Sequence, residues 1–146
     1  MIRHILVVCV GNICRSPMAE ALLRDALREQ QDIIVESAGL GALVDRPASE
    51  HAVTLMQERG LDISKHRARQ ITPDMIHEAD LMLVMEAGHK RAIELNEPAA
   101  RPKIYRLGEW QDRDIEDPYR QPRDAFEAAL ADIDEGVVEW TKRITG

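Results

Sequence analysis

Aromatic residues are scarce in this chain, at 3% of 146 residues, so aliphatic side chains and methionine must build its core. No apolar run approaches the roughly 20 residues that a membrane-spanning helix needs. The N-terminus carries Arg3 and His4 but has neither a signal-peptide core nor a small-residue cleavage site. The only two cysteines stand five positions apart, which excludes a disulfide framework. We therefore expect a cytoplasmic protein with no membrane insertion.

Positive charge is also in deficit, because the formal net charge is −7 and no basic stripe with interleaved aromatic residues occurs. This composition argues against a nucleic acid partner. An acidic protein should also repel a phosphorylated substrate. Salt screens charges beyond ~8–10 Å, however, so positive groups at the binding site itself can outweigh the negative charge of the whole protein. The length predicts a single domain, residues 1–146, that buries about two-thirds of its unfolded surface.

Short apolar runs alternate with helical patterns along the chain. The runs predict four strands, at residues 5–8, 33–39, 81–85 and 103–107. Capping residues and helical spacing predict helices that begin near Ser16, Ser49, Thr72, Glu86 and Pro122. The first helix runs to about Glu29 with Ser16 as its N-cap, and Gly60 closes the second. This alternation is typical of an α/β sandwich with a mainly parallel sheet.

The segment from Cys9 to Ser16, Cys-Val-Gly-Asn-Ile-Cys-Arg-Ser, joins the first strand to the first helix. Such a loop can turn successive N–H groups inward around an anion, beside the positive N-terminal end of the helix. Arg15 can present a bidentate fork to two phosphoryl oxygens. The same positive field would favour the thiolate of Cys9 and make it a nucleophile. The segment therefore predicts a phosphate site with a reactive cysteine.

A thiolate that displaces an alcohol from a phosphate needs an acid to protonate the leaving oxygen, and the loop supplies none. Asp117 is the best candidate, because Asp117-Pro118 places a carboxylate on a stiff turn within the long segment 108–121. Asp112, Asp114 and Glu116 are its nearby competitors.

Together these residues resemble the low-molecular-weight protein tyrosine phosphatases. The likeness covers residues 7–20 and continues, in the family's order, at residues 36–39, 66–71, 79–85 and 117–119. It implies a flavodoxin-like, phosphotyrosine phosphatase I-like three-layer sandwich with four parallel strands in the order 2-1-3-4. The site would lie at the carboxyl ends of the strands. The resemblance further implies a phosphocysteine on Cys9, Asp117 as acid and then base, and no metal or cofactor.

The resemblance also assigns supporting residues. The loop residues that would bind substrate are Val10, Gly11, Asn12, Ile13, Cys14 and Ser16. In the family pattern the serine hydrogen-bonds the thiolate, and the asparagine is tied to Ser37 and His66 in a network that holds the loop open. For Cys14 two interpretations stay open: a small buried hydrophobe, or a resolving thiol that captures oxidised Cys9 as a disulfide.

One stretch departs from many family members, because residues 40–44 carry no aromatic wall residue. In this respect the chain resembles the bacterial subgroup associated with exopolysaccharide or capsule export, whose substrate is a tyrosine autokinase. The substrate slot would then be lined by Leu40, Ile13 and Tyr119. The implied partner is the tail of a membrane-bound tyrosine kinase. Arg120 stands where eukaryotic relatives often have a second tyrosine, which implies a different rim.

Three other functions share parts of this pattern. An arsenate reductase on the same fold needs cysteines far down the chain, and none follows Cys14. Protein-arginine phosphatases carry a threonine at the position of Ile13, and an apolar residue there favours an aromatic phosphoester over a guanidinium. A phosphocysteine carrier module of a sugar-transport system also places a cysteine on an anion site. Such a carrier needs no general acid, so Asp117 distinguishes it from an enzyme.

Overall fold

A four-stranded parallel sheet forms the middle layer of the computed structural model, which describes residues 1–146. The strands are β1 (His4–Cys9), β2 (Ile34–Gly39), β3 (Leu81–Val84) and β4 (Ile104–Arg106). Their order is β2-β1-β3-β4, so the predicted order 2-1-3-4 is confirmed. Val7 at the centre of β1 pairs with Ser37 on one side and Leu83 on the other. The predicted edge position of the last strand is also confirmed.

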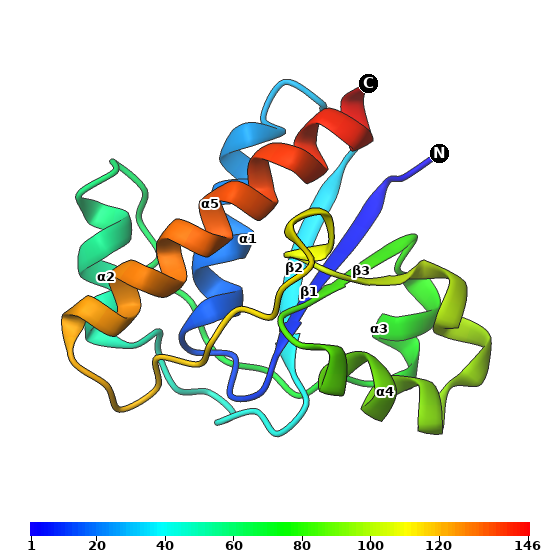
Figure 1. The fold of residues 1–146 in the computed structure, drawn as a ribbon, viewed down its shortest axis with the longest axis horizontal. Helices are drawn as coiled ribbons and strands as arrows, with labels where there is room; N and C mark the ends of the chain where they lie inside the picture. The colour runs from blue at the N-terminus through cyan, green and yellow to red at the C-terminus, as the bar shows by residue number, and fades with distance from the viewer.

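Helices cover both faces of the sheet and complete the predicted three-layer α/β sandwich (Figure 1). The helices are α1 (Arg15–Ala26), α2 (Glu50–Gln57), α3 (Pro73–Glu78), α4 (Ala87–Asn96) and α5 (Arg123–Thr145), with 3-10 turns at Pro98–Lys103 and Glu109–Gln111. Helices α1, α2 and α5 lie on one face, whereas α3 and α4 cover the other (Figure 1). No helix combines the length and apolar character that crossing a bilayer requires.

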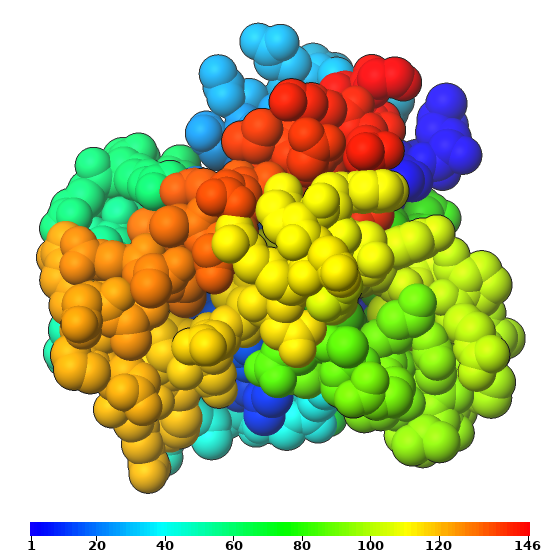
Figure 2. Space-filling view, viewed as in Figure 1, coloured from blue at the N-terminus to red at the C-terminus, as the bar shows by residue number.

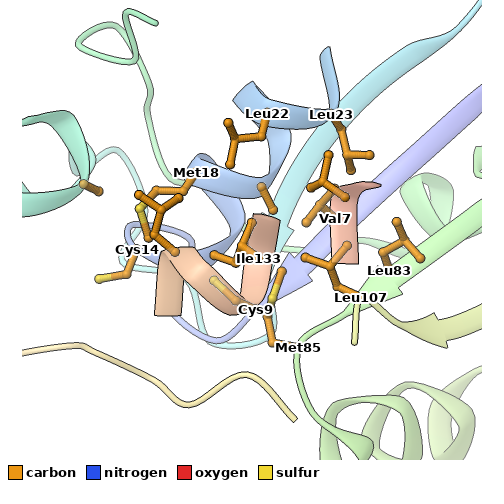
Figure 3. Close-up of a cluster of buried hydrophobic side chains, with 14 of the residues drawn as sticks. Val7, Cys9, Cys14, Met18, Leu22, Leu23, Leu83, Met85, Leu107 and Ile133 are labelled. Atoms are coloured by element: carbon orange, nitrogen blue, oxygen red, sulfur yellow. The ribbon is translucent and has the colours of Figure 1, made fainter. Parts of the chain in front are cut away.

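Strand β1 supplies side chains to both hydrophobic clusters, because successive residues of a strand point to opposite faces. Ile5, Val7 and Cys9 belong to the larger cluster of 28 buried residues under α1 and α5. Leu6 and Val8 belong to the cluster of 10 buried residues under α3 and α4. The thiol of Cys9 therefore ends the strand on the α1 side, among the apolar side chains drawn in Figure 3.

Helix ends deviate from the sequence-based expectations at two places. Helix α1 begins at Arg15 with Cys14 at its N-cap position, so the prediction that Ser16 is the N-cap was wrong. Ser16 lies in the first turn and directs its hydroxyl at Cys9 instead. The same helix ends at Ala26 rather than near Glu29. At α3 the predicted cap is confirmed, because Thr72 Oγ1 accepts a hydrogen bond from Met75 N at 3.2 Å.

Candidate active site

The loop between β1 and α1 turns its carbonyl groups outward and its amide groups inward. Each carbonyl from residue 9 to residue 13 accepts a hydrogen bond from the surrounding scaffold; the donors are the amides of Leu40, Gly41, Leu43 and Ser49 and the ring of His66. Inside the loop, the amides of Val10, Gly11, Ile13 and Cys14 donate to no protein acceptor. A run of such free donors in one short loop forms a nest that is suited to an anion.

Close approach of two backbones fixes the outer wall of this loop. A Cβ at Gly39 would lie 2.3 Å from the carbonyl oxygen of Val10, so only glycine fits at the end of β2. Asn12 adopts a left-handed conformation with φ of 60°, which asparagine tolerates better than most residues. The close approach at Gly39 and the left-handed turn at Asn12 let the segment close into a compact loop rather than extend as a strand.

The thiol of Cys9 lies at the base of the nest. Its Sγ accepts a hydrogen bond from the amide of Asn12 at 3.3 Å and lies 2.9 Å from Ser16 Oγ. Because Asn12 Nδ2 donates to Ser16 Oγ at 2.7 Å, the serine hydroxyl proton is left for the sulfur. This arrangement stabilises negative charge on Cys9.

Asn12 also connects the loop to the rest of the protein. Its Nδ2 donates to Ser37 Oγ at 3.0 Å, and its Oδ1 accepts the amide of Arg69 at 3.0 Å. The Nε2 of His66 donates to the carbonyl of Asn12 at 2.7 Å. The structure thus brings together the expected network of Asn12, Ser16, Ser37 and His66. The side chains of Asn12 and Ser16 are fully buried behind the loop.

Arg15 is buried beneath the loop, with 1% of its surface exposed. Its Nη1 donates to Glu86 Oε2 at 2.5 Å and to the carbonyl of Ile115 at 2.6 Å. In contrast, Nε has no hydrogen-bond partner, and Nη2 lies 3.6 Å from Asp117 Oδ2. One edge of the guanidinium is therefore held by the protein, and the other is free for two oxygens of a ligand.

Glu86 was missed as a site residue, because the sequence pattern presents it only as a helix start. It directly precedes α4 at the carboxyl end of β3, next to the strand that ends in Cys9. His89 is buried beside it, with Nε2 3.5 Å from Glu86 Oε2, and burial lowers the pKa of this imidazole. The sequence signal for Glu86 is its position just after a central parallel strand, because open α/β sheets bind ligands at the carboxyl ends of their strands.

A cavity of about 210 Å³ opens above the thiol. Its lining residues are Cys9, Val10, Gly11, Ile13, Cys14, Arg15, Gly41, Leu43, Asp117 and Tyr119. Figure 2 shows the N-terminal loop in blue at the bottom of this hollow, between the segment before α5, the start of α4 and the loop after β2. The predicted apolar walls at Ile13 and Tyr119 are present at this cavity.

Leu40 does not line the cavity, so its prediction as a wall residue was wrong. It is two residues from Ala38 in β2 and therefore points to the same face, where it packs on the cluster under α3 and α4. Gly41 and Leu43 occupy the wall in its place.

Among the candidate acids, only Asp117 lines the cavity. Its Oδ1 accepts the amide of Tyr119 at 3.1 Å, which fixes the carboxylate on its turn. Asp112 is paired with Arg106 at 2.8 Å, and Asp114 accepts the amide of Ala87 at 2.9 Å. No group of three or more His, Cys, Asp or Glu side chains is placed so that it could hold a metal ion.

A family model described as low molecular weight phosphotyrosine protein phosphatase matches residues 4–146. The chain belongs to this phosphatase family. The predicted family and the predicted class of enzyme, a protein-tyrosine-phosphatase, are thereby confirmed. The match extends over both the Cys9 loop and the Asp117 turn.

Several relatives of this phosphatase align over nearly its whole length. A probable low molecular weight protein-tyrosine-phosphatase EpsP from Ralstonia solanacearum is 52% identical, over 99% of this chain and 97% of that protein. The structure of Vibrio vulnificus Wzb in complex with benzylphosphonate has a TM-score of 0.92 at 40% identity, over 98% of this chain and 99% of that one. The YwlE arginine phosphatase from Geobacillus stearothermophilus has a TM-score of 0.90 at 33% identity, over 98% of this chain and 93% of that one.

The second cysteine of the phosphatase loop differs from the first in its electrostatic environment. The pKa of the Cys14 thiol is raised to about 12, chiefly by burial and also by the charges of Asp117 and Cys9, which outweigh the lowering by Arg15 and Ser49. Cys14 packs in the larger hydrophobic cluster with Met18 (Figure 3). Its thiol is therefore protonated at neutral pH. The redox role predicted for Cys14 stays a prediction.

Iodoacetamide at neutral pH is expected to alkylate Cys9 and leave Cys14 unmodified. Both side chains are 3% exposed, so exposure cannot distinguish them, whereas a protonated thiol reacts far more slowly than a thiolate. Mass spectrometry of the digested protein reads out the two sites separately. Denatured protein serves as the control, since both thiols should then react. Equal labelling of the two cysteines in the folded protein would contradict the expectation.

Proposed function

We propose that this chain hydrolyses protein phosphotyrosine through a phosphocysteine intermediate on Cys9, with residues 1–146 as one functional unit. The proposal rests on the position of Cys9 Sγ, which lies at the base of a cavity among unpaired amides. The free edge of Arg15 and the carboxylate of Asp117 border the same cavity. The residues that we assign as nucleophile, anion donors and acid thus border one cavity.

In the first step, the thiolate of Cys9 attacks phosphorus, and the bond from phosphorus to the tyrosine oxygen breaks. Asp117, protonated at the start, gives its proton to that leaving oxygen. The inward amides and the Nε and Nη2 atoms of Arg15 hold the equatorial phosphoryl oxygens, on which charge accumulates during transfer.

In the second step, Asp117, now a carboxylate, takes a proton from a water molecule that attacks the phosphocysteine. The sulfur–phosphorus bond breaks, inorganic phosphate leaves, and the thiolate of Cys9 is regenerated. The hydroxyl of Ser16, 2.9 Å from the sulfur, stabilises that leaving thiolate. Asp117 ends the cycle protonated, as it began.

The apolar walls of the cavity favour an aromatic phosphoester. Ile13, Leu43 and Tyr119 flank the path from the surface to Cys9, and the shorter phosphoserine would not bring its phosphorus down to the sulfur. The complex of Vibrio vulnificus Wzb with benzylphosphonate, in which one methylene group joins an aromatic ring to phosphorus, supports this preference for an enzyme of the same fold.

The physiological substrate that we propose is a tyrosine autokinase of exopolysaccharide or capsule production, met in the cytoplasm at its tail. The absence of an aromatic wall in residues 40–44 leaves the mouth open to a flexible segment. Similarity to EpsP and to Wzb supports this assignment.

A protein-arginine phosphatase is the second candidate, because YwlE shares the fold at a TM-score of 0.90. Fold similarity therefore cannot separate the two activities, and the apolar side chain of Ile13 in the cavity favours tyrosine. A phosphocysteine carrier module would have no use for Asp117 at the mouth.

The decisive measurement compares initial rates on matched peptides that carry phosphotyrosine, phosphoserine or phosphoarginine. We expect steady turnover of phosphotyrosine and little of the other two. A preference for phosphoarginine would overturn the argument from the cavity walls, and a single stoichiometric phosphoryl transfer without turnover would indicate a carrier. Phosphotyrosine mass spectrometry of cells with and without the enzyme then tests the kinase assignment separately.

A further inference from the structure

Two arginines that follow wall residues of the cavity in the chain have no carboxylate partner. Arg120 directly follows Tyr119 of one wall, and Arg46 lies three residues after Leu43 of the opposite wall. Both are exposed, and neither forms an ion pair. Most other lysines and arginines are paired, as in the contacts of Arg59 with Asp134 and of Arg123 with Glu58. In a protein of net charge −7, unpaired cations at this position are unexpected.

The backbone holds Arg120 in a defined place. Its φ of 63° lies in the left-handed region, within a turn closed by the hydrogen bond from Gln121 N to the carbonyl of Pro118 at 2.8 Å. Its guanidinium lies 5.1 Å from the centre of the Tyr119 ring, a cation–π distance. Arg120 is therefore attached to a wall residue of the cavity while its N–H donors remain free.

The backbone of Arg46 is held in place on the other side. Its amide donates to the carbonyl of Leu43 at 3.0 Å, and its own carbonyl accepts the amide of Ala68 at 2.9 Å. The loop that carries it and the segment before α5 lie at the same end of the sheet as the Cys9 loop (Figure 1). Asp45 and Glu116 are exposed carboxylates of these two segments, and neither is paired with Arg46 or Arg120.

We propose that Arg120 and Arg46 bind anionic groups that flank the phosphotyrosine in the substrate, and that they are specificity-determining residues. This inference rests on the proposed function and adds the chemistry of the substrate segment. A bound phosphotyrosine fills the cavity up to its mouth, so neighbouring side chains of the peptide pass over the two walls. The anion can be a carboxylate of Asp or Glu or the phosphate of a second phosphotyrosine, since both accept the fork of an arginine.

The test compares kcat/KM for three phosphotyrosine peptides, whose flanking residues are alanine, glutamate or a second phosphotyrosine. For the wild-type protein we expect the anionic peptides to exceed the alanine peptide by a factor of roughly two to five for each arginine engaged, the range of exposed ion pairs. The ratio of kcat/KM for an anionic peptide to kcat/KM for the alanine peptide should fall in Arg120→Gln and in Arg46→Gln. It should approach one in the double variant. If the second phosphotyrosine raises kcat/KM more than glutamate does, the preferred anion is a phosphate. If it does not, the preferred anion is a carboxylate.

Two further variants separate charge from structure. Arg120→Lys keeps the charge and should retain most of the ratio, which a purely structural role of the arginine would not predict. Arg3→Gln removes an exposed, unpaired arginine at the opposite end of the sheet and should leave the ratio unchanged. Raising salt from ~0.1 M to ~1 M shortens the screening length from ~10 Å to ~3 Å and should abolish the preference.

Equal kcat/KM for the three peptides in the wild-type protein, or an unchanged ratio in the double variant, would overturn this inference and leave the proposed function intact. Failure of the wild-type protein to hydrolyse any phosphotyrosine peptide would overturn both. The two failures are therefore distinguishable from the same set of rates.

Discussion

Cys9→Ser is expected to lower the turnover of phenyl phosphate by roughly 10⁴–10⁶-fold, the scale of losing a catalytic nucleophile. A serine hydroxyl is a much weaker nucleophile than a thiolate at neutral pH, and no basic side chain is hydrogen-bonded to residue 9 to activate it. The neighbours of Cys9 Sγ are hydrogen-bond donors, namely the amide of Asn12 and the hydroxyl of Ser16. They stabilise negative charge on the sulfur but cannot remove a proton from serine.

Turnover is measured by phosphate release, and the intermediate by acid quench of the wild-type reaction followed by mass spectrometry of the Cys9 peptide. The Cys9→Ser protein should bind inorganic phosphate, because the amides and Arg15 are unchanged, and this binding shows that the loop is folded. Substantial turnover by Cys9→Ser, with phosphate binding intact, would contradict a covalent mechanism on this residue. Failure to find phosphate on Cys9 in the quenched wild-type enzyme would contradict it independently.

The parts of the fold that could be predicted from the sequence are those fixed by local patterns. The apolar run before Cys9 forms a strand buried on both faces because its alternate side chains enter two different hydrophobic clusters. The loop from Cys9 to Ser16 could be interpreted as a phosphate site because backbone amides, and not distant side chains, make most of it.

Features that depend on contacts distant in sequence could not be predicted in this way. Glu86 meets Arg15 across 71 positions, and nothing in either local pattern indicates that pairing. Asn12 Oδ1 likewise accepts the amide of Arg69 across 57 positions. The error at Leu40 was avoidable, since two-residue periodicity from Ala38 already places it on the other face.

Asp117→Asn is expected to slow phenyl phosphate by about 10²–10⁴-fold, the usual contribution of a single proton donor, and to slow p-nitrophenyl phosphate much less. The p-nitrophenolate group leaves without a proton, so its release does not depend on an acid. Asparagine keeps the side-chain oxygen that accepts the amide of Tyr119, and the turn that carries residue 117 therefore stays in place. The kcat/KM values for the two substrates, measured on wild type and variant, report the first step alone and exclude the hydrolysis of the phosphocysteine that both substrates share, so their ratio reports the acid.

A matched control comes from Asp112→Asn in the same segment, because Asp112 is exposed, contacts Arg106 and lies outside the cavity lining. This variant should leave both rates close to those of the wild type. Equal slowing of the two substrates by Asp117→Asn would mean that residue 117 positions the substrate or Arg15, whose Nη2 lies 3.6 Å from its carboxylate, rather than donating a proton. Unequal slowing with a normal Asp112→Asn requires the proton to come from Asp117, because no competing carboxylate borders the cavity.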